Sequence, residues 1–124
     1  MEKSQAEYIR LKFGLTLKRI IQANKAKTLE ARQHNQPDHG LIDSFSKLES
    51  SSGLRKATLI DFAAGKSNPT ATTLAAILDA LNINLEEFGA QYDRITEKEI
   101  HEHIRLTEKA KKDRGRRTKK RTNN

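Results

Sequence analysis

The chain has 124 residues, 35% of them hydrophobic and 5% aromatic, which is enough for one small domain with polar extensions. It contains no cysteine, and this excludes disulfides and thiolate metal sites. No apolar run approaches the roughly 18 residues that predict a transmembrane helix. The N-terminus lacks the basic-then-apolar order of a signal peptide. We therefore expect a cytoplasmic protein with no membrane association.

The formal net charge of +8 is concentrated at the C-terminus. Residues 105–124 contain ten Lys or Arg against Glu108 and Asp113, whereas residues 1–104 contain 14 charges of each sign. A block of like charges repels itself, usually stays disordered and often binds nucleic acid. We predict that residues 111–124 form a disordered basic tail. The alternative is a solubilising tail that has no partner.

The N-terminal part predicts one helix followed by a polar segment. Five apolar residues recur at helical spacing and predict a helix over residues 5–24: Ile9, Phe13, Leu17, Ile20 and Ile21. Residues 25–42 are mostly polar and predict a loop or a frayed helical extension. His34 and His39 lie there, and no carboxylate stands at ligand spacing, so we expect solvated histidines and no metal site.

Residues 43–92 carry the densest pattern and predict four short helices. Asp43 or Ser44 can cap the first helix, which the turn at Gly53 ends. The second helix covers residues 55–64, and Gly65 supplies the left-handed residue that closes it. The third helix begins at Thr70 and carries an apolar i, i+3, i+4, i+7 stripe, formed by Leu74, Ile77, Leu78 and Leu81. The fourth helix begins at Asn84, and the carboxylate of Glu87 follows three residues later.

A final helix is predicted over residues 96–110, because Thr96 and Glu99 form a capping box. No segment alternates like a strand, so the predicted fold class is all-α. Two short helices joined by a tight glycine turn form a helix-turn-helix unit. Leu59 and Phe62 would bury the second helix of this unit, and its other face would be free to enter a DNA major groove.

Residues 44–88, SFSKLESSSGLRKATLIDFAAGKSNPTATTLAAILDALNINLEEF, resemble the lambda-repressor/Cro-type (XRE) helix-turn-helix domain. The segment GLRKAT, followed by GKSNPTATTLAAILDALNI, carries most of this resemblance. It implies a five-helix lambda-repressor-like bundle over residues 5–93 that binds double-stranded DNA as a homodimer. The 96–110 helix and the basic tail would be additions to that bundle.

The resemblance also implies roles for individual residues. Four positions of the second helix fall where the family reads base edges: Lys56, Ala57, Ile60 and Asp61. Eight others fall where the family contacts DNA phosphates, at helix starts and in the loop after the second helix: Ser44, Ser46, Arg55, Thr58, Lys66, Ser67, Asn68 and Thr70.

Several positions depart from the family pattern. The family favours a small residue at Glu49 and an apolar residue at Ser52. An acidic residue is common at Ala63, and its arginine partner would align with Ile21. We predict that an apolar contact replaces this ion pair. The 25–42 loop is also longer than the usual link between helices 1 and 2.

Residues 41–92 contain four basic and six acidic residues, so electrostatic affinity for DNA must come from other parts of the chain. Basic residues of the first helix offer some of it, and the tail offers the rest through Arg114, Arg116, Arg117, Lys119, Lys120 and Arg121. We expect removal of residues 105–124 to weaken DNA binding and to preserve sequence preference.

Together these features predict a sequence-specific transcriptional regulator, a repressor of a bacterium or a mobile element, that needs no cofactor. No catalytic constellation is present, so we do not expect an enzyme. The alternative is an antitoxin-type or other partner-binding protein that also autoregulates its operon and wraps a toxin with its tail or with the 96–110 helix. RNA binding is disfavoured because aromatic platforms for base stacking are lacking.

Overall fold

The computed structural model describes the backbone of residues 3–37 and 40–122 and the side chains of residues 5–37 and 40–115. His39, which we expect to be solvated, therefore lies outside the described residues. Within those residues every regular element is a helix, which confirms the predicted all-α class. The helices are α1 (Lys3–Gln33), α2 (Phe45–Ser52), α3 (Lys56–Ala63), α4 (Ala71–Leu81), α5 (Leu85–Arg94) and α6 (Glu97–Thr122).

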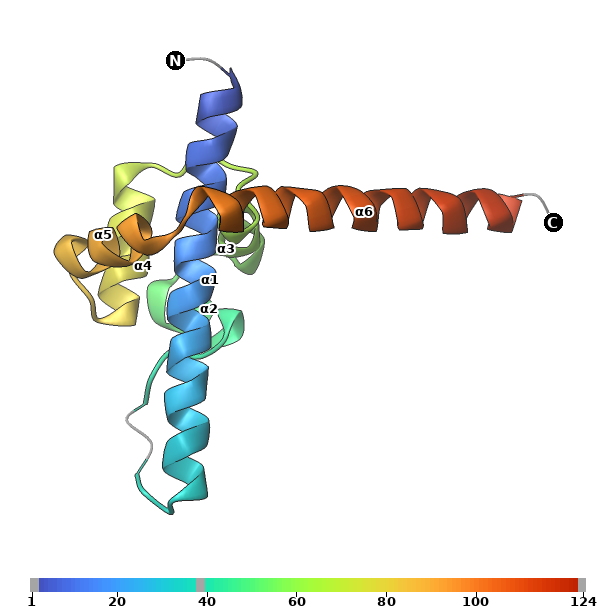
Figure 1. Cartoon of the computed structure of the whole chain (residues 1–124). Coiled ribbons are helices and arrows are strands. Elements are labelled where there is room, and N and C mark those ends of the chain that lie inside the picture. Colours follow the sequence, from blue (N-terminus) through green and yellow to red (C-terminus); the bar gives the residue numbers. More distant parts are fainter. Residues whose placement is uncertain (1–2, 38–39, 123–124) are drawn as a thin grey trace.

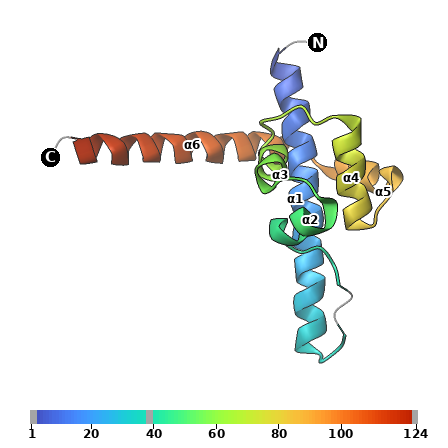
Figure 2. The ribbon, with the colours of Figure 1, turned by 180° about the vertical axis from the view of Figure 1, so that it is seen from behind.

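The long helix α1 is the centre of the bundle, and the other helices pack around its N-terminal two thirds (Figure 1). Helices α3, α5 and α6 contact α1 directly, whereas α2 contacts α3 and α4. Seen from behind, α2 and α3 lie in front of α1, and α4 and α5 lie to one side (Figure 2). Helix α6 crosses α1 and projects far beyond the bundle (Figure 1).

The core brings together the apolar residues of α1 to α4. Its buried members are Leu17, Ile21, Leu48, Leu59, Phe62, Ala63, Ile77 and Leu81. Phe13 of α1 stacks near Phe88 and Tyr92 of α5, with ring centroids 5.9 and 4.8 Å apart. These contacts fix the helices that carry and surround α3.

Helix starts are capped by the side chains that the sequence indicates. Ser44, Thr70, Asn84 and Thr96 each accept a hydrogen bond from the backbone N–H three residues later. Such caps satisfy amide groups that have no partner within the helix. The turn between α2 and α3 has Gly53 at φ 74°, a conformation that costs little only for glycine.

Helix α1 continues to Gln33 rather than ending near residue 24, so residues 25–33 form the helical extension predicted as the alternative to a loop. Residues 25–33 contain neither glycine nor proline, so nothing in them breaks a helix. Thr28 is buried, and the Asn24 side-chain amide donates to the Ile42 carbonyl at 2.9 Å. The returning chain thus braces the extension, and the predicted 25–42 loop is reduced to residues 34–44.

Helix α6 also continues beyond its predicted end at residue 110. It runs to Thr122, where the sequence predicts a disordered tail from residue 111. Lys and Arg are good helix formers, and no proline interrupts the segment. Of the tail's predicted phosphate-binding side chains, only Arg114 lies within the described side chains; Arg116, Arg117, Lys119, Lys120 and Arg121 lie outside them. No helix among the described residues has the length and apolar character to cross a membrane.

Candidate nucleic-acid interface

Helix α3 buries one face and presents the other to solvent. Leu59, Phe62 and Ala63 are buried against the core. The structure brings the four predicted base-reading residues together on the opposite, exposed face: Lys56, Ala57, Ile60 and Asp61. The side chain of Ile60 is among the exposed large hydrophobic residues, at 47% exposure. This exposure leaves the Ile60 side chain accessible on the solvent-facing side of α3.

The start of α3 is capped from α2. Arg55 occupies the N-cap position without a side-chain cap, and the Glu49 carboxylate accepts from the Lys56 backbone N–H at 2.6 Å instead. The Lys56 ammonium donates to Ser46 Oγ at 3.2 Å. Ser52 Oγ accepts from the Leu54 N–H at 3.1 Å. The two departures from the family pattern in α2 therefore both satisfy amides of the turn and of α3.

The end of α3 lies directly against the backbone of α1. Gly14 is buried, and a Cβ there would lie far inside contact distance of the Ala63 carbonyl oxygen and 2.7 Å from that of Phe62. At Gly65, where φ is 71°, a Cβ would lie 2.9 Å from Leu11 Cα. A glycine inside a helix ordinarily only weakens it, whereas the structure shows that Gly14 sets how closely α1 and α3 approach.

Ile21 and Ala63 occupy the two positions of the ion pair that is common in the family. Both belong to the buried cluster and are only 7% and 4% exposed. An unpaired charge at either position would be costly to bury. Their shared burial agrees with the predicted replacement of the ion pair by apolar packing.

The predicted phosphate-contacting residues lie at the starts of α2, α3 and α4 and in the loop between α3 and α4. Ser44 and Thr70 are the N-caps of α2 and α4, where free amide groups favour anions. Arg10 of α1 joins the loop, because its guanidinium donates to Asn68 Oδ1 at 3.3 Å and to the Gly65 carbonyl at 3.4 Å. The remaining predicted positions are all at least partly exposed: Ser46, Arg55, Thr58, Lys66 and Ser67.

Other basic residues of α1 are directed elsewhere. The Lys12 ammonium lies 4.3 Å from the centre of the Tyr92 ring, a favourable cation–π contact. Arg19 pairs with Glu99 of α6 at 2.7 Å. Arg10, by contrast, contacts the loop after α3.

Two acidic residues within 41–92 lie far from the start of α4. Asp79 and Glu87 line a polar hollow at the end of α4 and the start of α5, whereas Thr70 caps the other end of α4. Eleven residues of helix separate these ends by about 16 Å.

Asp43 pairs with Lys47 at 2.7 Å, and this hydrogen bond lowers the pKa of the Asp43 carboxyl. Asp61 remains exposed on the solvent-facing side of α3.

The model of the Helix-turn-helix family matches residues 46–88, from within α2 to within α5. This segment is thus a helix-turn-helix domain. The match supports the resemblance of residues 46–88 to XRE, or lambda-repressor-like, domains, and with it a DNA-binding transcription regulator of this type. Neither the comparison with curated proteins nor the comparison with solved structures gave a match.

Proposed function

We propose that the protein is a sequence-specific repressor that binds double-stranded DNA as a homodimer and inserts α3 into the major groove. The observation that carries this proposal is the exposed stripe on α3, fixed at its start by Glu49 and at its end by Gly14 and Gly65. A recognition helix must be held rigidly so that its side chains meet base edges in one register.

The exposed residues of α3 have the chemistry for base recognition. Lys56 can donate to guanine acceptors, and Asp61 can accept from the cytosine amino group. Ala57 and Ile60 offer apolar contact to thymine methyl groups. Phosphate contacts at the start of α2 and around the α3–α4 loop would fix the register without reading sequence, with Arg10 and Lys66 supplying positive charge.

The basic half of α6 would supply affinity that the bundle lacks. Residues 109–122 contain nine Lys or Arg and one Asp, and α6 carries this charge out of the bundle (Figure 1). Phosphate contacts release counterions, so each contact steepens the dependence of affinity on salt by about one unit. This part of α6 should therefore contribute affinity and little sequence preference.

Fluorescence anisotropy tests both parts of the proposal. Full-length protein and a variant truncated after residue 104 are titrated onto duplex from upstream of the protein's own gene and onto a scrambled duplex, over a salt series. Both proteins should prefer the native duplex, and truncation should flatten the salt dependence. A full-length variant with the nine basic residues of 109–122 changed to Gln separates loss of charge from loss of helix.

Substitution of α3 separates base reading from phosphate binding. Lys56→Ala should reduce preference for the native duplex by about 1–3 kcal/mol, whereas Lys66→Ala should weaken binding to both duplexes alike. If neither full-length nor truncated protein discriminates at any salt, α3 does not read this DNA. The antitoxin-type, partner-binding function would then become the leading proposal.

A further inference from the structure

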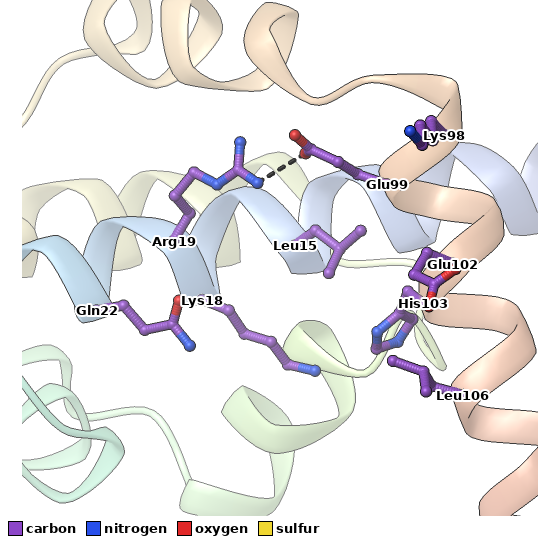
Figure 3. Close-up of a pocket in the computed structure, with 9 residues that line it drawn as sticks. All are labelled: Leu15, Lys18, Arg19, Gln22, Lys98, Glu99, Glu102, His103 and Leu106. Atoms are coloured by element: carbon purple, nitrogen blue, oxygen red, sulfur yellow. Dashed lines mark hydrogen bonds and ion pairs between the residues drawn. The ribbon is translucent and has the colours of Figure 1, made fainter.

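A hollow of about 500 Å³ lies where α6 crosses α1 (Figure 3). Its volume falls within the range of small-molecule sites, about 300–1,000 Å³. Leu15 of α1 and Leu106 of α6 provide apolar wall on the two sides, and Leu106 is 51% exposed. The hollow includes none of the residues named as base-reading or phosphate-contacting.

The acidic residues of this hollow are already paired. Glu99 accepts from the Arg19 guanidinium at 2.7 Å, and Glu102 accepts from Arg105 at 2.6 Å. Within the part of the chain that the structure describes, the Lys18 ammonium and the His103 imidazole have neither a hydrogen bond nor an ion pair, and the His103 bond to Thr107 uses its backbone carbonyl. The Lys18 side chain extends from α1 towards His103 (Figure 3). Two basic groups thus converge at a place that no carboxylate of these residues neutralises.

The surroundings of both groups disfavour their charged forms. Partial burial lowers the pKa of the Lys18 ammonium. Burial, and then the positive charge of Lys18, lower the pKa of the His103 imidazole. An anion between the two groups would favour protonation of both. The neighbouring apolar wall would in turn favour a ligand with an apolar body over a bare inorganic ion.

We propose that this hollow binds a small amphiphilic anion, with a carboxylate or phosphate head between Lys18 and His103 and an apolar body against Leu15 and Leu106. Such a ligand would bridge α1 and α6 and thereby hold the basic half of α6 in a fixed direction. The site does not depend on the proposed recognition of DNA by α3, and its test needs no DNA.

Amide NMR titration of the full chain tests the site with three probes. The first is 4-phenylbutyrate, the second is its neutral analogue 4-phenylbutanol, and the third is inorganic phosphate. We expect 4-phenylbutyrate to change the chemical shifts of backbone amides around the hollow. Its Kd should be on the order of 1 mM, because a ligand of about 12 non-hydrogen atoms gains roughly 0.3 kcal/mol per atom. The alcohol and phosphate should each bind at least about fivefold more weakly.

Three results of this titration would overturn the proposal. The absence of shifts around the hollow at about 20 mM 4-phenylbutyrate, roughly twentyfold above the expected Kd, would exclude the site. Equal binding of the alcohol would show that charge plays no part. Equal binding of phosphate would show a general anion site, such as one for a DNA phosphate, with no use for an apolar body.

Matched substitutions on α1 assign the charge to one residue. Lys18→Met removes the ammonium and keeps the apolar stem, so binding of 4-phenylbutyrate should weaken at least about fivefold. Lys25→Met makes the same change at an exposed position of α1 outside the hollow, and binding should not change. Equal affinities of the two variants would refute the role of Lys18.

Two further variants keep the test decisive if Lys18→Met disturbs the fold. Leu106→Ser alters an exposed residue and should weaken binding of 4-phenylbutyrate but not of phosphate. Lys18→Glu should reverse the preference, so that 4-phenylbutylamine binds more tightly than 4-phenylbutyrate. Unchanged binding in Leu106→Ser, or an unchanged preference in a folded Lys18→Glu protein, would contradict the proposal.

Discussion

Gly14→Ala places a methyl group between α1 and the end of α3. The three atoms nearest to the added Cβ are all backbone atoms of Phe62 and Ala63, the closest of them inside contact distance. Backbone cannot rotate away as a side chain can, so the helices must separate. Overpacking of this kind costs typically about 1–3 kcal/mol, and we take the upper value. Alanine recovers about 1 kcal/mol through its better helix propensity, which leaves a net loss of about 2 kcal/mol.

Thermal unfolding followed by far-UV circular dichroism measures this loss. For a chain of this size, about 2 kcal/mol lowers Tm by about 8 °C. Gly89→Ala is the matched control, because Gly89 lies within α5 and a Cβ there meets nothing within 4 Å. It should raise the stability by up to about 1 kcal/mol. If Gly14→Ala raises Tm as Gly89→Ala does, the close approach of α1 and α3 is wrong.

Three further predictions concern the core, the turn and pH. Ile21→Arg should lower the free energy of unfolding by about 3 kcal/mol, measured by thermal unfolding, because it buries an unpaired charge. Adding Ala63→Glu should recover part of this loss. An unchanged Tm in the single variant would contradict the replacement of the ion pair by an apolar contact. Glu49→Ala should lower the free energy of unfolding by about 1 kcal/mol, measured with urea, because α3 loses its cap. Glu49→Gln should lower it by less. Equal losses in the two variants would exclude the hydrogen bond to the Lys56 amide as the cause. Burial and Lys18 lower the pKa of His103 below its ordinary value, so the unfolded chain binds more protons than the folded chain near pH 6. The free energy of unfolding should therefore rise from about pH 5 to about pH 7. His103→Gln should reduce that rise, and a pH profile identical to that of the unmodified protein would refute the contribution of His103.

The sequence predicts best those features that depend on a few neighbouring residues. Ser44, Thr70 and Asn84 cap helices because each side chain reaches an amide three residues later, and such spacing is visible in the sequence. Gly53 takes a positive φ for an equally local reason. These signals, with the apolar stripes between them, were sufficient to predict an all-α fold and an exposed face on the second helix of the turn.

Features that depend on distant residues escaped sequence reasoning. Gly14 weakens a helix locally, and its value appears only when α3 lies against it. Glu49 caps α3 across a turn, seven residues before the amide that it accepts from. The sequence leaves residues after 24 open between a loop and a helical extension, and the hydrogen bond from Asn24 to Ile42, eighteen residues along the chain, favours the extension only in the folded protein. The residue type at each of these positions does not by itself reveal whether the residue makes a stabilising contact with a distant part of the chain.

The projection of α6 from the bundle gives the protein a fixed reach. Residues 107–122 continue beyond the hollow at α1, and sixteen helical residues span about 24 Å. That length corresponds to about seven base pairs of duplex at 3.4 Å each. A coil of the same composition would sample many distances, whereas a helix acts as a ruler. In the proposed complex the flank contacted beside each half-site would then have one length, and DNA footprints would end at a defined edge.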